Sequence, residues 1–126
     1  MSLTGLAVVH ARSDGVEHSV DAPLIHCHDG NKLVLAFVSR TALADYFRLP
    51  KRPSMQESNL LVDRNLDAFG RIVRAKYDTG ERSIYDAYGQ SIPRVDVTLE
   101  DMQHSGEEFA ADVLKINPGF RSYPGA

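Results

Sequence analysis

The chain has 126 residues, of which 43% are hydrophobic and 25% are charged, and its formal net charge is −3. This composition is typical of one globular domain and excludes a disordered chain. The acidic balance gives no general electrostatic reason to bind nucleic acid or an anionic membrane. We therefore predict a single domain over residues 1–126, with an irregular C-terminal tail at 117–126.

The cellular location is predicted from two sequence features. The chain has one cysteine, Cys27, so no disulfide can form within it, which fits a reducing compartment. No N-terminal segment resembles a signal peptide, and no apolar run approaches the roughly 18 residues that a membrane span needs. We expect a cytoplasmic protein that does not bind membranes.

Two hairpins are predicted in the first third of the chain. The run Gly5–Ala11 and the alternating segment Val16–Val20 flank a turn signal and could pair with each other. The second hairpin joins Leu24–His28 to Asn31–Val38 through Asp29-Gly30, a two-residue loop of the type I′ kind. That loop sets these facing pairs: His28 and Asn31, His26 and Leu33, and Leu24 and Leu35.

The strand Leu33–Val38 is apolar on both faces. A strand of this kind is usually central and covered on both sides. One long helix can cover only one face, so the other face needs the C-terminal helix or a second copy of the chain. Because an uncovered face would exceed the apolar area that soluble monomers usually expose, we predict a homodimer.

Helices are predicted in the middle of the chain. Ser39 or Thr41 caps a short helix that ends near Arg48. Ser54–Gly80 then reads as one long amphipathic helix, with a capping box that Ser54 begins and Glu57 completes. Its apolar stripe consists of Met55, Val62, Leu66, Phe69, Val73 and Tyr77.

The last third of the chain contains weaker signals. Ile84–Tyr88 and Arg94–Thr98 are predicted as strands, Thr98 caps a short helix, and Glu107–Ile116 is predicted as a last helix. The predicted fold class is α+β. It has a small antiparallel sheet of about four or five strands, packed by one long helix and one or two short helices.

This arrangement resembles a known family. The residues that carry the resemblance are Asp29, Gly30, the strand Leu33–Val38, Ala42, Leu43, Asn65, Phe69, Ile72, Lys76, Tyr77, Gly80, the strand Val95–Thr98 and Asp101. They are similar to short bacterial proteins of domain-of-unknown-function family 1488, over about Leu24 to Met102. The resemblance implies a small α+β fold in a bacterial protein and brings no activity with it.

The triplet His26-Cys27-His28 is the most suggestive chemical motif. A strand places both imidazoles on one face, where they could share a metal ion, but zinc sites normally need three or four ligands. A third ligand would come from His10, His18, Asp29 or another chain. We therefore favour no metal site. Cys27 faces away from the histidines and is predicted to be a buried apolar residue.

Two further features are candidates for binding. Arg48, Lys51 and Arg52 form a basic cluster after two aromatic residues, a mixture that phosphate or single-stranded nucleic-acid sites use. A charged loop between helices explains the cluster better in an acidic protein, so we do not expect nucleic acid as the partner. Asn65 flanks the apolar stripe of the long helix, where a half-buried amide needs a hydrogen-bond partner.

The sequence favours a non-enzymatic interaction module that forms a homo-oligomer or binds a protein partner. We assign no catalytic residue and no cofactor. The first alternative is a small metal-binding protein or enzyme centred on His26 and His28. The second alternative is a nucleic-acid accessory protein that uses Arg48, Lys51 and Arg52.

Overall fold

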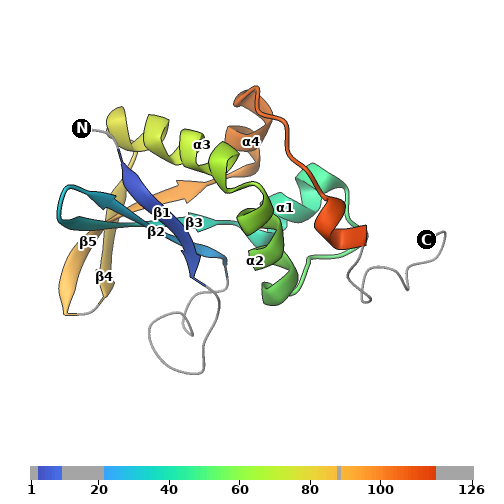
Figure 1. Ribbon diagram of the computed structural model, residues 1–126, viewed down its shortest axis with the longest axis horizontal. Helices are drawn as coiled ribbons and strands as arrows, with labels where there is room; N and C mark the ends of the chain where they lie inside the picture. The colour runs from blue at the N-terminus through green and yellow to red at the C-terminus, as the bar shows by residue number, and fades with distance from the viewer. Residues whose placement is uncertain (1–2, 10–21, 88, 116–126) are drawn as a thin grey trace.

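The structure is a computed structural model that describes residues 3–9, 22–87 and 89–115. Within these ranges the chain forms a five-stranded sheet, four α-helices and a 3₁₀ turn (Figure 1). The elements are β1 (Thr4–Val9), β2 (Leu24–Asp29), β3 (Lys32–Val38), α1 (Arg40–Phe47), α2 (Met55–Arg64), α3 (Leu66–Asp78), β4 (Ser83–Ala87), β5 (Gln90–Val97), α4 (Leu99–His104) and η2 (Asp112–Lys115). The predicted strand Val16–Val20 and the tail 117–126 lie outside the described residues.

The α+β fold class is confirmed, but the sheet is mixed and not wholly antiparallel. The strand order is β1-β2-β3-β5-β4, and β3 pairs with β5 in parallel while the other pairs are antiparallel. The parallel pair arises because β5 returns to the edge of β3 after a long crossover through the helices and β4. Such a connection is required for a parallel pair, whereas a tight turn joins antiparallel strands.

The β2–β3 hairpin is present, although its predicted register is wrong. Asp29 pairs with Lys32, so the two-residue loop is Gly30-Asn31 and begins one residue later than predicted. Gly30 has φ +65°, and a glycine with positive φ at the first loop position fits a type II′ turn. Each residue of β2 therefore faces a residue of β3 two positions further along than predicted, for example Leu33 instead of Asn31 opposite His28. Because side chains alternate between the two faces of a strand, a shift of two positions leaves each residue on its predicted face of the sheet.

The helices cover one face of the sheet, as Figure 1 shows for α3 and α4. The main core lies between them and the sheet. It includes Ile25, Cys27, Val34, Ala36, Val38, Val95 and Val97 from the strands and Leu43, Leu61, Val62, Phe69, Val73, Tyr77 and Met102 from the helices. The strand residues in this core share one face because they alternate along their strands.

The opposite face of the sheet is buried within a single chain, so the predicted need for a second copy to cover it is wrong. Leu35 is 0% exposed and Phe37 is 2% exposed. Leu24 of β2 and Ile92 of β5 are buried beside these two residues, and the four together form a second, smaller core. Tyr85 reaches the ring of Phe37 at a centroid distance of 5.2 Å, although β5 lies between their strands. Tyr85 of β4 therefore reaches across β5 to pack on this face.

The predicted long helix is two helices, with a break at Asn65. Asn65 has φ −114° and ψ 28°, outside the helical region, and it ends α2 and begins α3. The predicted capping box of Ser54 and Glu57 is present, and Phe69 and Val73 are buried as expected. The break occurs because Asn65 is engaged by a distant segment, described below.

The predicted last helix is also wrong. Residues 106–111 have no regular secondary structure and lead into η2, which is a single short turn. We call residues 106–111 the C-terminal strap. Asn65, between α2 and α3, bonds the backbone of the strap, and Arg71 of α3 bonds its Glu107. In the described part of the chain, no helix is long and apolar enough to cross a membrane.

Candidate functional site

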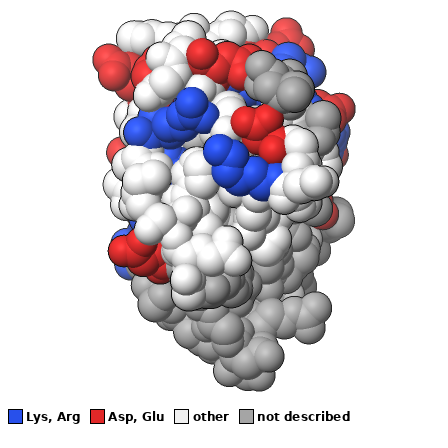
Figure 2. All heavy atoms as spheres, turned by 90° about the vertical axis from the view of Figure 1, so that its left-hand side faces the viewer, with Lys and Arg blue, Asp and Glu red and all other residues white. Residues whose placement is uncertain are grey.

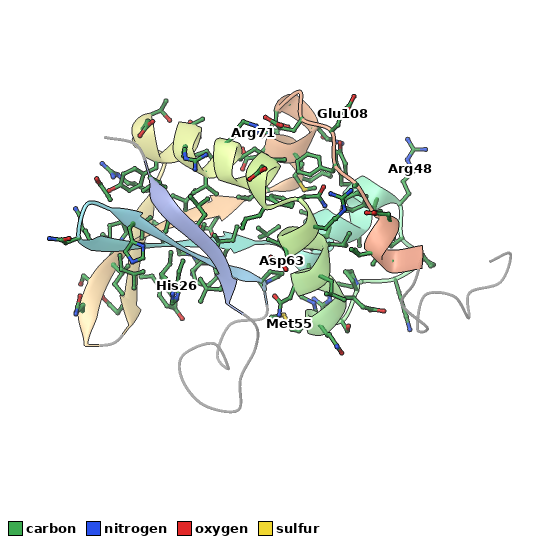
Figure 3. The ribbon with its side chains drawn as sticks, viewed as in Figure 1. His26, Arg48, Met55, Asp63, Arg71 and Glu108 are labelled. Carbon is green, nitrogen blue, oxygen red and sulfur yellow. The ribbon has the colours of Figure 1, made fainter. Side chains whose placement is uncertain are left out.

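The two histidines lie on one face of β2, as predicted, with His26 half-buried and His28 exposed. His26 projects below the sheet in Figure 3. Of the proposed third ligands, Asp29 instead accepts a 2.7 Å hydrogen bond from the Tyr77 hydroxyl, and His10 and His18 lie outside the described residues. Among the residues that the structure describes, no group of three or more His, Cys, Asp and Glu is arranged to hold a metal ion.

Cys27 is fully buried beneath the helices, in agreement with the prediction. Burial raises the pKa of its thiol to about 12, despite the opposing effect of the positive charge of Arg74. The thiol is therefore protonated at neutral pH, and a protonated thiol is a poor nucleophile and a poor metal ligand. This removes the chemical basis for a role of Cys27 in catalysis.

The basic cluster of the sequence is divided in space. Arg48 points outward at the end of the molecule opposite His26 (Figure 3), and it holds the left-handed conformation that ends α1. Lys51 is exposed on the link between α1 and α2. Arg52, unlike the other two, lines a cavity, and Arg40 and Arg94 line the same cavity. The three basic residues therefore do not form one binding site, although Arg52 lines a cavity.

This cavity has a volume of about 300 Å³ and lies at the carboxyl ends of the parallel strands β3 and β5. We call it the arginine cavity. Its polar lining includes Ser39, Arg40, Arg52, Arg94, Asp96 and Thr98. The residues converge there because β3 leads directly into α1, β5 leads directly into α4, and the link after α1 returns beside them.

Hydrogen bonds position the guanidinium groups of Arg40 and Arg94 in this cavity. The Arg40 guanidinium donates to the carbonyl of Pro53 through Nε at 2.8 Å and through Nη2 at 2.6 Å. Arg94 donates to the Asp96 carboxylate through Nε at 2.9 Å, and its guanidinium lies 4.1 Å from the centre of the Phe37 ring. The cation–π contact and the ion pair fix the plane of this guanidinium.

Asn65 has the partner that the sequence required. Its side-chain amide donates to the carbonyl of Ala110 at 2.8 Å and to that of Leu61 at 2.8 Å. Its Oδ1 accepts a hydrogen bond from the Ala110 backbone N–H at 2.6 Å. One side chain therefore binds both backbone groups of a strap residue, which gives Asn65 a structural role in holding the strap.

Two ion pairs extend this attachment. Arg71 bonds the Glu107 carboxylate through two nitrogens, at 2.7 and 2.8 Å, and Arg64 bonds Asp112 at 2.8 Å. A cavity of about 450 Å³ lies at this junction and is lined by both signs of charge, including Asp63, Arg71 and Glu108 (Figure 3). Mixed charge does not select one class of ligand, so we interpret this surface as the seat of the strap.

A different kind of feature lies on β4, the outermost strand beside β5. Ile84 is 64% exposed, and it is the one large hydrophobic side chain that is exposed among the described residues. Figure 2 views the molecule from the side of the hairpin tips. Charged side chains gather in the upper half of this face, and the described surface below them is mostly uncharged.

Sequence reasoning missed Arg40 and Arg94 as site residues. The sequence identified Arg94 only as the first residue of the predicted strand Arg94–Thr98. Their convergence depends on the parallel pairing of β3 with β5, for which no local sequence signal exists. The helix-capping residues Ser39 and Thr98 were the available signal, because each marks a strand end that turns directly into a helix.

Compared with known proteins, the chain matches no family model, no curated protein and no solved structure.

Proposed function

We propose that the protein is a non-enzymatic interaction module that acts as a homodimer through the outer edge of β4. The observation that carries the proposal is the exposure of Ile84 on that outermost strand. An edge strand presents backbone N–H and C=O groups that can pair with another strand, and proteins usually protect such edges with charge or proline. An exposed isoleucine on the edge instead favours association.

The sequence of this edge is complementary to itself. Antiparallel pairing of two copies about a two-fold axis at Ile84 places Ile84 opposite its symmetry mate. It also places Arg82 of each copy opposite Asp86 of the other. Facing pairs of opposite charge and facing apolar pairs each stabilise an antiparallel ladder. In this two-fold register the two Ile84 side chains face each other, and Arg82 and Asp86 form two ion pairs between the copies.

The cellular context belongs to the same proposal. We propose a cytoplasmic bacterial protein, related to the family named above. The presence of one cysteine that is buried as a protonated thiol fits a reducing compartment. The resemblance over Leu24 to Met102 supports the bacterial origin.

The homodimer is tested by mass. Light scattering coupled to size-exclusion chromatography should give twice the chain mass of 13.9 kDa at high protein concentration. Ile84→Lys should give a monomer, because it places two like charges opposite each other at the axis. Gln56→Lys adds the same charge on an exposed part of α2 and should leave the dimer intact. A wild-type mass of one chain at every concentration would refute the proposal.

The register is tested by cross-linking. Ile84→Cys should form a disulfide-linked dimer under mild oxidation, because facing Cα atoms in an antiparallel pair are about 4.5–5.5 Å apart, within disulfide range. Gln90→Cys places an exposed thiol on β5, away from the axis, and serves as the matched control. Equal cross-linking of both variants would mean that collision, and not a fixed register, joins the chains.

The ion pairs are tested by charge reversal. Arg82→Asp and Asp86→Arg should each weaken the dimer about tenfold, since each puts like charges opposite at two symmetric positions. The double variant restores opposite charges and should recover the wild-type dissociation constant. The double variant, like Arg82→Asp alone, lacks the contact of Arg82 with the Tyr77 ring. Recovery of the dissociation constant would therefore show that the single variants act through the interface and not through that contact.

A further inference from the structure

We propose that the seat of the strap is a docking groove for an extended segment of a partner protein, and that the strap occupies it as an internal competitor. The strap itself shows what the groove recognises, since side chains of the helices bind its backbone, its aromatic ring and its carboxylate. This surface is distinct from the β4 edge and takes a different partner, so the two proposals are tested separately.

The groove binds the backbone of the segment that lies in it. Asn65 accepts the Ala110 N–H at 2.6 Å and donates to the Ala110 carbonyl at 2.8 Å. A neighbouring strand gives an extended residue the same pair of bonds, and they do not depend on the side chain at that position. Asn65 is buried, and its further bond to the Leu61 carbonyl holds the amide in place. The groove can therefore read the extended backbone of another chain.

An aromatic ring anchors the segment. The centre of the Phe109 ring lies 5.0 Å from that of Phe69 and 5.1 Å from that of Tyr46. Aromatic pairs at these distances attract each other beyond the effect of buried area alone. Phe109 is only partly buried against the main core, so a ring can enter or leave this position from the surface.

Two arginines set the direction and register of the segment. Arg71 binds Glu107, two residues before the anchor, and Arg64 binds Asp112, three residues after it. The side chain of Arg71 is 57% exposed and that of Arg64 is 47% exposed. Exposed ion pairs contribute little to stability, so these contacts can exchange for the same contacts with another chain. The groove thus selects an acidic group, an aromatic ring and a second acidic group, in that order.

One residue of the strap fits the groove poorly. Glu108 lines the cavity of about 450 Å³ together with the carboxylates of Asp63 and Asp67 (Figure 3). Both arginines of this lining are already bonded to other carboxylates, although Asp67 also attracts Arg71. A basic side chain in place of Glu108 complements Asp63 and Asp67. A partner segment with the order acidic, basic, aromatic, small therefore fits better than the strap does.

The attachment of the strap to the chain explains why it occupies the groove despite this misfit. The strap follows α4 after Ser105, and a short connection holds a segment at an effective concentration of about millimolar. A segment of another protein displaces it only by fitting better. The strap therefore excludes weak ligands from the groove.

The first test is binding of a fluorescently labelled peptide with the sequence of residues 105–115 and the substitution Glu108→Lys. It should bind the Phe109→Ala chain, whose own anchor is missing, about tenfold more tightly than it binds the wild-type chain. Ala110→Pro removes the N–H that Asn65 accepts, so this variant weakens the strap independently and should give the same result. No saturable binding, or equal affinity for all three chains, would overturn the proposal.

The second test asks whether the strap leaves the wild-type chain. Saturating Glu108→Lys peptide should accelerate hydrogen exchange at the chain's own Ala110 amide, while the amides of α3 remain protected. Glu108→Lys made in the full chain improves the strap, so it should weaken peptide binding about tenfold. Unchanged Ala110 exchange at saturation would mean that the strap is a permanent part of the fold, and would overturn the proposal.

Matched variants test the preference at position 108. Asp67→Asn should reduce the preference for the Glu108→Lys peptide over the unsubstituted peptide, because it removes a carboxylate from the cavity. Asp78→Asn removes the same charge from the same helix outside the cavity lining and should leave the preference unchanged. An equal effect of both variants would mean general attraction to an acidic protein and would overturn the assigned position.

The oligomeric state identifies the occupant. The Ile84→Lys chain should bind the peptide as the wild-type chain does, which separates this proposal from the dimer. A dimer that persists in Ile84→Lys, and is lost when Phe109→Ala is added, would mean that the strap of a second copy takes the groove. That result would overturn the proposal of a different partner protein.

Discussion

At the scale of single residues, α2 carries two buried polar side chains on its inner face. Ser58 is 0% exposed and Asn59 is 1% exposed. Within the described residues, neither the Ser58 hydroxyl nor Oδ1 of Asn59 has a hydrogen-bond partner. A buried polar atom without a partner loses its bonds to water on folding and gains nothing in return. These atoms therefore reduce the stability of the helix that carries them.

Ser58→Ala should accordingly stabilise the protein, by about 1 kcal/mol, since it removes an unpaired hydroxyl and adds a better helix former. Ser54→Ala on the same helix should destabilise it by about 1 kcal/mol, because the Ser54 hydroxyl caps the helix through the Glu57 N–H. Urea unfolding of both variants measures the two changes. Destabilisation by Ser58→Ala would show that its hydroxyl has a favourable contact in solution.

Cys27 should be chemically inert in the folded protein. Its thiol is buried and its pKa is raised to about 12, so almost none is ionised at neutral pH. We expect a thiol-specific disulfide reagent to react with the native protein only as fast as the chain unfolds, and to react rapidly in urea. A native reaction rate that rises with reagent concentration without limit would contradict the burial.

At the scale of elements, the break at Asn65 shows what helical periodicity cannot predict. The apolar spacing continues from α2 into α3, since Phe69 and Val73 are buried as one helix would require. The break depends on Ala110, which is 45 residues away in sequence. Hydrophobic patterns report which face is buried, but they contain no information about a backbone segment that arrives from elsewhere.

Asn65→Ala should release the strap. It removes the bonds to Ala110 and leaves the backbone groups of that residue without a partner, at a cost of about 2 kcal/mol. Hydrogen exchange should accelerate at the Ala110 amide while the amides of β3 remain protected. Asp63→Ala, at an exposed neighbouring position, is the control and should change neither measurement. Uniform acceleration throughout the chain would instead indicate global destabilisation.

The β2–β3 hairpin shows how much local sequence can establish. Two apolar runs around Asp29-Gly30 were sufficient to predict both strands and the face of every residue. The turn residues did not determine the register, because Gly30 can occupy either position of a two-residue loop. The two possible registers bury the same side chains, so hydrophobicity could not distinguish between them.

At the scale of the whole molecule, carboxylates attach the last third of the chain to the helices. Burial alone would raise the pKa of Asp101, but bonds from Lys76 and Thr98 outweigh it and hold the pKa below its ordinary value. The hydrogen bond from Arg71 lowers the pKa of Glu107, and that from Arg64 lowers the pKa of Asp112. Groups with lowered pKa values stabilise the fold above their unfolded pKa, and this stabilisation is lost as pH falls through the folded value.

We therefore expect stability to fall as the pH drops below about 4, where carboxylates become protonated. Asp101→Asn should destabilise the protein at pH 7, and its difference from the wild type should shrink at pH 3, where the wild-type carboxyl also loses its charge. Urea midpoints at the two pH values measure this. Glu100→Gln on the same helix is the control, and an equal effect of both variants would contradict the role of Asp101.

The sequence predicted the fold class, most elements and several caps, but not how the sheet is assembled. The pairing of β3 with β5 depends on residues at opposite ends of a crossover and has no local signature. The arginine cavity was missed for the same reason, since Arg40 and Arg94 meet only through that pairing. Arg52 was identified because its charge stands out locally, without regard to where the chain places it.

The parallel junction also sets an order of events during folding. The strands β2 and β3 can pair through a two-residue loop, whereas β5 can join β3 only after the whole stretch 39–89 has been drawn together, and closing so long a loop is slow. Four residue pairs, Leu35 to Val38 with Arg94 to Val97, make this closure. We expect Val97→Ala to slow refolding, and Phe109→Ala in the strap mainly to speed unfolding, as stopped-flow measurements in urea can determine. Until closure, the inner edge of β3 is open to other chains, so the same junction that forms the cavity makes the nascent protein most prone to aggregation.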